Sequence, residues 1–445
     1  MALGHLLMSS HYSLIVQRRR VLALAVLLLA TSLIALPDTV SASIGRNCDS
    51  VGQSRQATVN GKAIKLVCLA EGAKRVWKQS QRGSFGATVY KPGAEKFVSM
   101  ARAVRTQEAQ CMLVMKNGKV IGEWNWDSHF TERNIELASV TKSFGATLIG
   151  IAVSKGIIAV DDLASKYITE WQGTPKEGIT VRHLLAMTSG LNESRPTVPA
   201  RDYYNTGGVD TVVSLVGRAS NQIGGTNSSA PQYRTPGRLF SYLDYTNSAA
   251  LSVVLRRATG ENVRDFAERE LLRPLGMSID DMTNPAAGES LLGAWYRGGC
   301  DDVAKLVQLY LNGGRWGGVQ ILNREFIRDA VTPQVTCGDC TSSSTERSVM
   351  YGAYGLHWWT NRISSSSGTN SNPVQTVLSG SERFPNVPAD MFFALGICGQ
   401  IGAGLPKRKL VVVVLRKGCD DPVQRAANWG PAFTLFMDEL ARTDN

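Results

Sequence analysis

Three stretches of the chain have the hydrophobic periodicity of helices. Residues 139–155 are apolar nearly all round a helix, which predicts a buried central helix rather than a surface one. Residues 247–258 and 301–312 have the spacing of amphipathic helices, and a glycine closes each of them. The middle of the chain is therefore expected to be mainly helical.

Strand patterns lie on both sides of these helices. Residues 111–124 surround Asn117-Gly118, a dipeptide that favours a two-residue hairpin turn. Residues 391–399 and 409–416 predict two apolar strands joined by a turn that contains Gly and Pro. Strands at both ends of the chain and helices between them predict an α+β fold in which the middle helices form a second lobe.

The N-terminal residues have the pattern of an export signal. Arg18, Arg19 and Arg20 precede the uncharged 16-residue stretch Val21–Leu36, and the small residues of Val40-Ser41-Ala42 follow. Residues 1–42 therefore predict a signal peptide that is cleaved after Ala42, with the protein exported to the periplasm, the cell envelope or the medium. An uncleaved anchor is the alternative, since a membrane span needs roughly 17–25 residues. The arginines also weakly resemble a twin-arginine signal.

Residues 43–95 predict an appendage and a linker. Polar and apolar residues alternate from Cys48 to Trp77 around Asn60-Gly61, a strong hairpin signal. We expect a small hairpin closed by a Cys48–Cys68 disulfide. It resembles short Cys-Gly-Cys-Trp modules of secreted bacterial proteins over some thirty residues. The stretch from Gln79 to Gly93 is expected to be a linker.

Composition places the chain among ordinary globular proteins. It has 445 residues, of which 43% are hydrophobic and 19% charged, so disorder, collagen and a coiled coil are excluded for the whole chain. The net charge is +11, but Lys and Arg are dispersed, so we expect no nucleic-acid partner and a surface suited to an anionic cell envelope.

The cysteines can form disulfides in the oxidising compartment to which the export signal would direct the protein. There are eight, and all of them lie after residue 42, which permits up to four disulfides. Cys337 and Cys340 have the spacing of a zinc knuckle or redox motif. No second such pair or paired His lies beside them, so a loop disulfide is preferred and no metal site is predicted.

Several catalytic arrangements are absent from the sequence. It contains no GxSxG, HExxH or GxxxxGK[ST] motif. After residue 42 only His129, His183 and His357 occur, and each is expected to be a packed or surface histidine. A Ser-His-Asp hydrolase is therefore disfavoured.

Ser139-Val-Thr-Lys142, at the start of the apolar helix, supports a different chemistry. A spacing of three residues puts both side chains on one helical face. Burial favours the neutral form of an amine, which can then accept the serine proton, and a helix N-terminus stabilises negative charge. Ser-x-x-Lys is a common tetrapeptide, and an exposed lysine on an ordinary helix is the usual interpretation. The apolar helix makes the catalytic interpretation preferable here.

A family resemblance extends this interpretation. Residues 137–190 resemble the β-lactamase-related serine hydrolases of the class C and penicillin-binding type. Further blocks resemble the family in its order, most closely the branch of 6-aminohexanoate-dimer hydrolases and related esterases: Pro236-Gly237, RRATG (256–260), LLRPLGM (271–277), LVQLYLNGG (306–314), YGLHWW (354–359) and PADMFFALGICGQ (388–400). The resemblance implies an antiparallel sheet flanked by helices, with an α-helical lobe, and a site between them.

The resemblance assigns roles to individual residues. Ser139 corresponds to the acylated nucleophile and Lys142 to its proton acceptor. The second motif of the family, Tyr-x-Asn, has two possible registers. Tyr242 has the usual distance from Pro236, and Asp244 then replaces the Asn. Tyr245-Thr-Asn247 spells the motif but needs a shift, so Tyr242 is preferred and Tyr245 is the alternative.

The third motif of the family, Lys-Thr-Gly or His-x-Gly, is replaced by Gly396-Ile-Cys398-Gly399-Gln400. The resemblance implies an oxyanion hole formed by the backbone N–H groups of Ser139 and Gln400. Gly399 is expected to let the substrate approach the strand, and Cys398, Asp244 and Asn247 are further candidates for substrate contact. Without the cation of the motif, esters or amides are favoured over β-lactams.

The sequence thus predicts a signal peptide (1–42), an appendage (43–95) and a serine hydrolase domain (96–445). The expected protein needs no cofactor and cleaves a small ester, amide or peptide through an acyl-serine intermediate. A D-alanyl-D-alanine carboxypeptidase or weak β-lactamase is one alternative. A non-catalytic envelope protein that uses the same fold for binding is another.

Overall fold

The computed structural model describes most of the chain after residue 86 and the strands before it. The chain divides into two compact units, residues 1–80 and 81–445. The described residues are 54–59, 62–71 and 74–79, for which only the backbone is considered, and 87–126, 135–191, 236–237, 240, 242, 246–279, 292–293, 296–334, 353–362, 384, 386–416 and 429–443.

The first unit contains a three-stranded antiparallel sheet. Its strands are β1 (Ser54–Val59), β2 (Lys62–Glu71) and β3 (Lys74–Gln79), in the order β1-β2-β3. Val59 pairs with Lys62, so the antiparallel pairing predicted on either side of Asn60-Gly61 is present. The predicted hairpin is extended by β3. Cys48 lies outside the described residues, so the Cys48–Cys68 disulfide stays a prediction.

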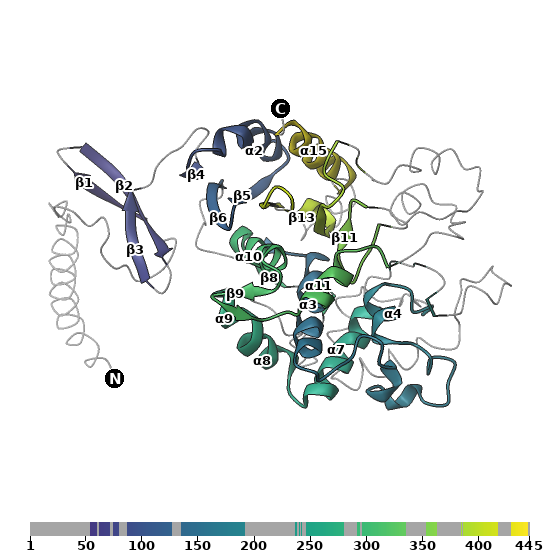
Figure 1. Ribbon diagram of the computed structural model, residues 1–445. Coiled ribbons are helices and arrows are strands. Elements are labelled where there is room, and N and C mark those ends of the chain that lie inside the picture. Colours follow the sequence, from purple (N-terminus) through teal and green to yellow (C-terminus); the bar gives the residue numbers. More distant parts are fainter. Residues whose placement is uncertain are drawn as a thin grey trace, which may run out of the picture. The chain divides into compact units, whose positions relative to one another are not determined.

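The second unit is organised around a seven-stranded sheet of order β11-β12-β13-β14-β5-β6-β4, in which every neighbouring pair is antiparallel (Figure 1). Its strands are β4 (Ala87–Tyr90), β5 (Ala109–Lys116), β6 (Lys119–Asn125), β11 (Trp359–Thr360), β12 (Phe392–Gly396), β13 (Gln400–Leu405) and β14 (Leu410–Arg416). The turn predicted at Asn117-Gly118 joins β5 to β6, and both residues have the positive φ that such a turn requires.

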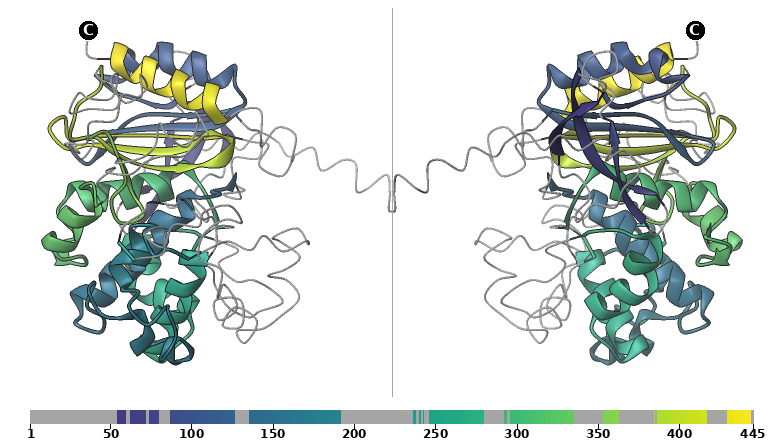
Figure 2. Two further views of the ribbon diagram at one scale, coloured as in Figure 1. Left: turned by 90° about the vertical axis from the view of Figure 1, so that its right-hand side faces the viewer. Right: turned by 90° about the vertical axis from the view of Figure 1, so that its left-hand side faces the viewer.

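Both faces of this sheet are covered, which explains the continuous apolar runs. In β14, Val411, Val413 and Leu415 belong to one buried cluster, whereas Val412 and Val414 belong to the other. The cluster of Val412 and Val414 also includes residues of α2 (Val98–Arg105) and α15 (Trp429–Arg442). The cluster of Val411, Val413 and Leu415 includes residues of α10 (Cys300–Leu311), which covers the opposite face of the sheet. Figure 2 shows α2 and α15 on one side of the sheet and the remaining helices on the other.

The helices on that other side form the predicted lobe around α3 (Val140–Ser154). Residues 140–152 of α3 are all buried, as expected for a central helix. The expected helices over residues 247–258 and 301–312 are present as α7 and α10. The other helical elements are η2 (Ala94–Phe97), η3 (Ala164–Lys166), η4 (Thr169–Trp171), α4 (Val181–Leu185), α7 (Thr246–Thr259), α8 (Val263–Ala267), η6 (Glu268–Leu272), α9 (Arg273–Leu275), α11 (Arg324–Ala330) and η7 (Ile397–Gly399).

Short strand pairs and a disulfide between two described cysteines also belong to this unit. Strands β7 (Ile135–Glu136) and β8 (Arg297–Gly298) pair with each other, as do β9 (Arg315–Trp316) and β10 (Val319–Gln320). A disulfide between Cys111 and Cys300 joins β5 to the first residue of α10. The sequence had not indicated this pairing. Cys337 and Cys340 lie outside the described residues.

Two boundaries differ from the sequence-based expectations. The apolar strand expected over residues 391–399 ends at Gly396, and β13 is an additional strand before the turn that leads to β14. It was missed because its glycines suggest a turn. Gly402 and Gly404 face Val303, Val307 and Phe392, where a Cβ would not fit. The expected linker over residues 79–93 also contains β4, which pairs with β6.

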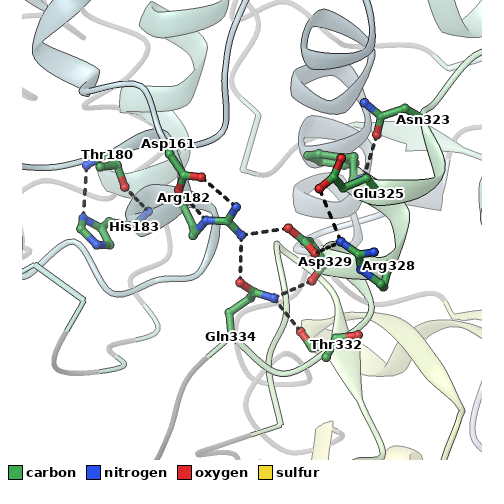
Figure 3. A network of polar contacts seen from close by, with 11 residues as sticks. Asp161, Thr180, Arg182, His183, Asn323, Glu325, Arg328, Asp329, Thr332 and Gln334 are labelled. Atoms are coloured by element: carbon green, nitrogen blue, oxygen red, sulfur yellow. Dashed lines mark hydrogen bonds and ion pairs between the residues drawn. The ribbon is translucent and has the colours of Figure 1, made fainter.

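A polar network ties the lobe together around Arg182 of α4 (Figure 3). Its guanidinium forms a bidentate pair with Asp161 and also donates to Asp329 and Gln334 at 3.1 Å. The Gln334 backbone N–H in turn donates to the Tyr354 carbonyl at 2.8 Å. The network therefore connects α4 and α11 to the segment that begins at residue 353.

None of the helices among the described residues has the length and apolar character required to cross a membrane.

Candidate active site

The segment that leads into Ser139 is fixed by strand pairing. Glu136 of β7 pairs with Arg297 of β8, and the Leu137 N–H donates to the Tyr296 carbonyl at 2.8 Å. Ala138 then has a φ of 48°, a left-handed conformation that is uncommon for a residue other than glycine. Ser139 follows as the N-cap of α3 and is partly exposed. The serine therefore lies at the start of a buried helix, after a strained residue.

The structure brings Lys142 to Ser139 as predicted. Lys142 Nζ lies 3.0 Å from Ser139 Oγ and donates to the Gly293 carbonyl, also at 3.0 Å. The Lys142 side chain is only 1% exposed. Removal from water disfavours the charged form of an amine, so the surroundings suit a lysine that accepts a proton.

Tyr242 lies beside this pair. Its ring centroid is 5.2 Å from Lys142 Nζ, and the ring packs against Trp359 at 5.4 Å and Tyr354 at 6.0 Å. Two buried aromatic rings thus hold Tyr242 next to the lysine. Tyr245 and Asp244 lie outside the described residues, so the structure gives no position for the alternative tyrosine.

Asn247, the last residue of the alternative motif, is turned into the core of the lobe. Its Oδ1 accepts from Ser189 Oγ at 2.6 Å, and its Nδ2 donates to Met187 Sδ at 3.2 Å. The side chain is fully buried, and these partners belong to the lobe rather than to the pair of Ser139 and Lys142. The expected substrate contact of Asn247 is therefore not supported by its surroundings.

The hairpin that contains the third motif approaches Ser139 through Gly396. A Cβ on Gly396 would lie 2.7 Å from the Leu137 carbonyl oxygen and 3.2 Å from the Ala138 Cβ. Cys398 is buried, has a φ of 73° and packs against Ala138. Cys398 is also disulfide-bonded. The hairpin thus contacts the two residues that precede the serine.

The structure gives Gly399 a packing role that the sequence did not suggest, and its expected role toward the substrate stays a prediction. A Cβ on Gly399 would lie 2.6 Å from Arg416 Nε and 2.7 Å from the Ala432 Cβ, so the missing side chain makes room for the protein's own arginine. The glycine whose missing side chain permits close approach to the serine segment is Gly396. Gln400 is fully buried, and its side-chain amide bonds to the backbone of Glu136 and Arg416.

His357 is a neighbour of Lys142 that the sequence did not identify. Its Nδ1 is 3.3 Å from the Lys142 carbonyl, and its own carbonyl accepts from Ser143 Oγ at 2.8 Å. Complete burial lowers the pKa of His357 from 6.5 to about 3. The imidazole is therefore neutral at physiological pH. His183, in contrast, belongs to the helix cap of α4 with Thr180. His129 lies outside the described residues.

No group of three or more His, Cys, Asp or Glu side chains suited to a metal ion occurs within the described part of the chain.

Comparisons with known proteins identify the family of the chain. The family model described as Beta-lactamase matches residues 97–430. Penicillin-binding protein 4* of Bacillus subtilis (strain 168) is 28% identical over 149 residues, which are 33% of this chain and 30% of that protein. The chain thus spans less than a third of that relative's length.

Solved structures share the fold at low sequence identity. A family VIII carboxylesterase has a TM-score of 0.57 at 17% identity, covering 80% of this chain and 98% of that chain. A penicillin-binding protein homologue from Caulobacter crescentus has a TM-score of 0.55 at 13% identity, covering 80% of this chain and 99% of that chain. The matched family model spans the whole sheet from β5 onward, with the lobe and the serine segment. The chain therefore belongs to the β-lactamase family.

Proposed function

We propose that this protein is a serine hydrolase that cleaves an ester or amide through an acyl-Ser139 intermediate. The observation that carries the proposal is the 3.0 Å distance between Ser139 Oγ and the nitrogen of the buried Lys142. The family to which the chain belongs and its fold similarity to a carboxylesterase support it.

The mechanism follows from these positions. Neutral Lys142 takes the proton of Ser139, and Oγ attacks the carbonyl carbon of the substrate. When the tetrahedral intermediate collapses, the bond to the leaving group breaks and the leaving group takes up the proton that Lys142 had accepted. Water then attacks the acyl-serine, releases the acid and returns the proton to Ser139. Tyr242, next to Lys142, is the second acid or base on this path.

The oxyanion hole combines the Ser139 N–H with an N–H of the hairpin after Gly396. Gly396, not Gly399, lies against the serine segment, so this geometry favours the Ile397 N–H over that of Gln400. Both N–H groups belong to the backbone, which holds them in place before the negative charge develops.

The proposed substrates are esters or amides that need no carboxylate, as in the esterase and 6-aminohexanoate-dimer hydrolase branch. Residues 396–400 contain no Lys, Arg or His that would bind one. The similarity to penicillin-binding proteins supports a D-alanyl-D-alanine carboxypeptidase as the second candidate.

A substrate screen separates these candidates. We expect turnover of p-nitrophenyl esters or linear amide dimers that is lost in Ser139→Ala, with little turnover of penicillin or of peptides ending in D-Ala-D-Ala. Faster turnover of these last two than of any ester would establish the second candidate instead.

We further propose that the protein works outside the cytoplasm. The export pattern of residues 1–42 and the Cys111–Cys300 disulfide support this, because disulfides persist in oxidising compartments. Mature protein recovered outside the cytoplasm should begin after Ala42. Full-length protein retained in the cytoplasm would contradict the proposal.

A further inference from the structure

We infer that Gln400 is a positioning residue whose buried amide locks the segment leading into Ser139 onto the end of the sheet. The inference rests on the proposed function, and assigns Gln400 a role through its side chain rather than through its backbone N–H.

The contacts of Gln400 join two separate segments. Its Nε2 donates to the carbonyls of Glu136 and Arg416, each at 2.9 Å. Its Oε1 accepts the Arg416 backbone N–H at 2.7 Å. Since Nε2 faces two carbonyls and Oε1 faces an N–H, the orientation of the amide is fixed by its partners.

Burial makes these contacts difficult to replace. Gln400 is 0% exposed, and its two hydrogen bonds to the Arg416 backbone are buried, while the bond to the Glu136 carbonyl is partly buried. Removing the amide deletes all three of these hydrogen bonds to backbone groups, and the loss is most costly at the buried Arg416. The segment before Ser139 would therefore be expected to shift toward other partners.

That segment is where a shift would matter most. Glu136 lies three residues before Ser139, and Ala138 between them has the strained φ of 48°. Such a conformation persists only where the surroundings enforce it. Strand β8 holds one side of the segment through Arg297, and Gln400 holds the Glu136 carbonyl from the sheet. Loss of the pairing with β8 or of the Gln400 hydrogen bond would let the backbone of Ala138 leave its left-handed conformation. Ser139 Oγ would then move relative to Lys142 Nζ.

Arg416 anchors the other end of this arrangement. Its buried guanidinium donates through Nη1 to the carbonyls of Val104 and Gln107, within and just beyond the end of α2, and packs beneath Gly399. Burial lowers the pKa of Arg416 to about 10, so the side chain is charged at neutral pH. A continuous path of polar contacts thus runs from α2 through Arg416 and Gln400 to Glu136.

Asn361, which directly follows strand β11 of the same sheet, is a matched control. It is also 0% exposed, and its Nδ2 donates to the carbonyls of Phe384, Val387 and Pro388. Its backbone N–H donates to the Met391 carbonyl, next to the end of β12 that is opposite to Gly396. The two amides are alike in chemistry and burial, but only Gln400 reaches the serine segment.

The test compares Gln400→Glu with Asn361→Asp in the full-length protein. Each substitution replaces two N–H donors by a carboxylate that donates none. The measurements are the rate of Ser139 labelling by a fluorophosphonate, kcat and KM for a p-nitrophenyl ester, and Tm. We expect Gln400→Glu to lower kcat about 10²-fold with a nearly unchanged KM, as for a misplaced nucleophile. Asn361→Asp should lower Tm to a similar extent and keep kcat close to wild type.

The pH dependence of kcat in Gln400→Glu adds a readout that a loss of folding stability alone would not change. At low pH the carboxyl group introduced by Gln400→Glu regains one O–H donor, so the ratio of the variant's kcat to that of wild type should rise as pH falls. Wild-type kcat in Gln400→Glu, or equal losses of kcat in both variants at equal Tm, would overturn the inference. If Gln400→Glu fails to fold, Gln400→Met provides the same kcat comparison. Failure of wild type to be labelled would overturn the proposed function, and this inference with it.

Discussion

Lys142 Nζ donates to the carbonyl of Gly293, a residue 151 positions further along the chain, at the same 3.0 Å that separates it from Ser139 Oγ. The carbonyl of Gly293 holds the amine beside the serine hydroxyl. This placement distinguishes Lys142 from a lysine on an ordinary surface helix. It also means that the serine and the lysine depend on each other.

Ser139→Ala and Lys142→Ala should therefore each abolish turnover while the fold persists. Residues that act as one unit are not additive, so the double variant should be little worse than either single variant. Ester hydrolysis measures turnover, and circular dichroism with Tm provides the control for folding. Full esterase activity in Ser139→Ala would exclude this mechanism.

Tyr242→Phe should lower kcat by about 10²–10⁴-fold, the usual contribution of a positioned acid or base. The ring lies against Lys142 and is held by Tyr354 and Trp359, so removal of the hydroxyl should leave its position unchanged. Tyr245→Phe is the matched control and should change kcat only slightly. The opposite order of severity would establish Tyr245-Thr-Asn247 as the motif.

His357 should make the folded protein less stable in acid. Its pKa is about 3 when folded and near 6.5 when unfolded, so between these values the unfolded chain binds a proton that the folded chain does not. The stability that neutral His357 provides is complete above pH 6.5 and is lost as pH falls toward 3, by up to about 1.4 kcal/mol per pH unit.

His357→Asn should weaken this dependence, because asparagine does not titrate and tolerates the positive φ of 57° at this position. Urea unfolding of both proteins between pH 5 and 7.5 measures the effect. As pH falls, the unfolding free energy of the wild type should decrease more than that of His357→Asn. If the unfolding free energies of the two proteins changed in parallel with pH, His357 would bind its proton over the same pH range in the folded and the unfolded chain, which contradicts the prediction.

A truncated protein that begins at Gln81 should keep the activity and Tm of the hydrolase unit. Residues 81–445 form one compact unit, and β4 is an edge strand of its sheet. A second truncation that begins at Phe97 removes β4 and exposes the edge of β6, so it should be less stable. Loss of activity in a folded protein that begins at Gln81 would show that the first unit takes part in catalysis.

The central helix and the pair on it could be predicted because their signals are local. The apolar residues of 139–155 specify a buried helix, and the spacing of Ser139 and Lys142 puts both on one face. The hairpin at Asn117-Gly118 is also a local signal. Each depends on residues within a few positions of one another.

The partners of this pair could not be predicted, because they come from distant segments through backbone groups. The Gly293 carbonyl and the Glu136 carbonyl have no signature in the sequence, and the role of Gln400 depends on both Glu136 and Arg416. Gly396 and Gly399 are alike in sequence, and only their different neighbours show which one lies against the serine segment.

The most direct test of the account is covalent labelling of Ser139. The purified protein is treated with a fluorophosphonate probe, and intact mass followed by peptide mapping locates the adduct. We predict a single adduct on Ser139, absent from Ser139→Ala and formed far more slowly in Lys142→Met, which keeps the length of the side chain without its amine. An unlabelled wild-type protein, or an adduct that persists at full rate in Ser139→Ala, would contradict the account.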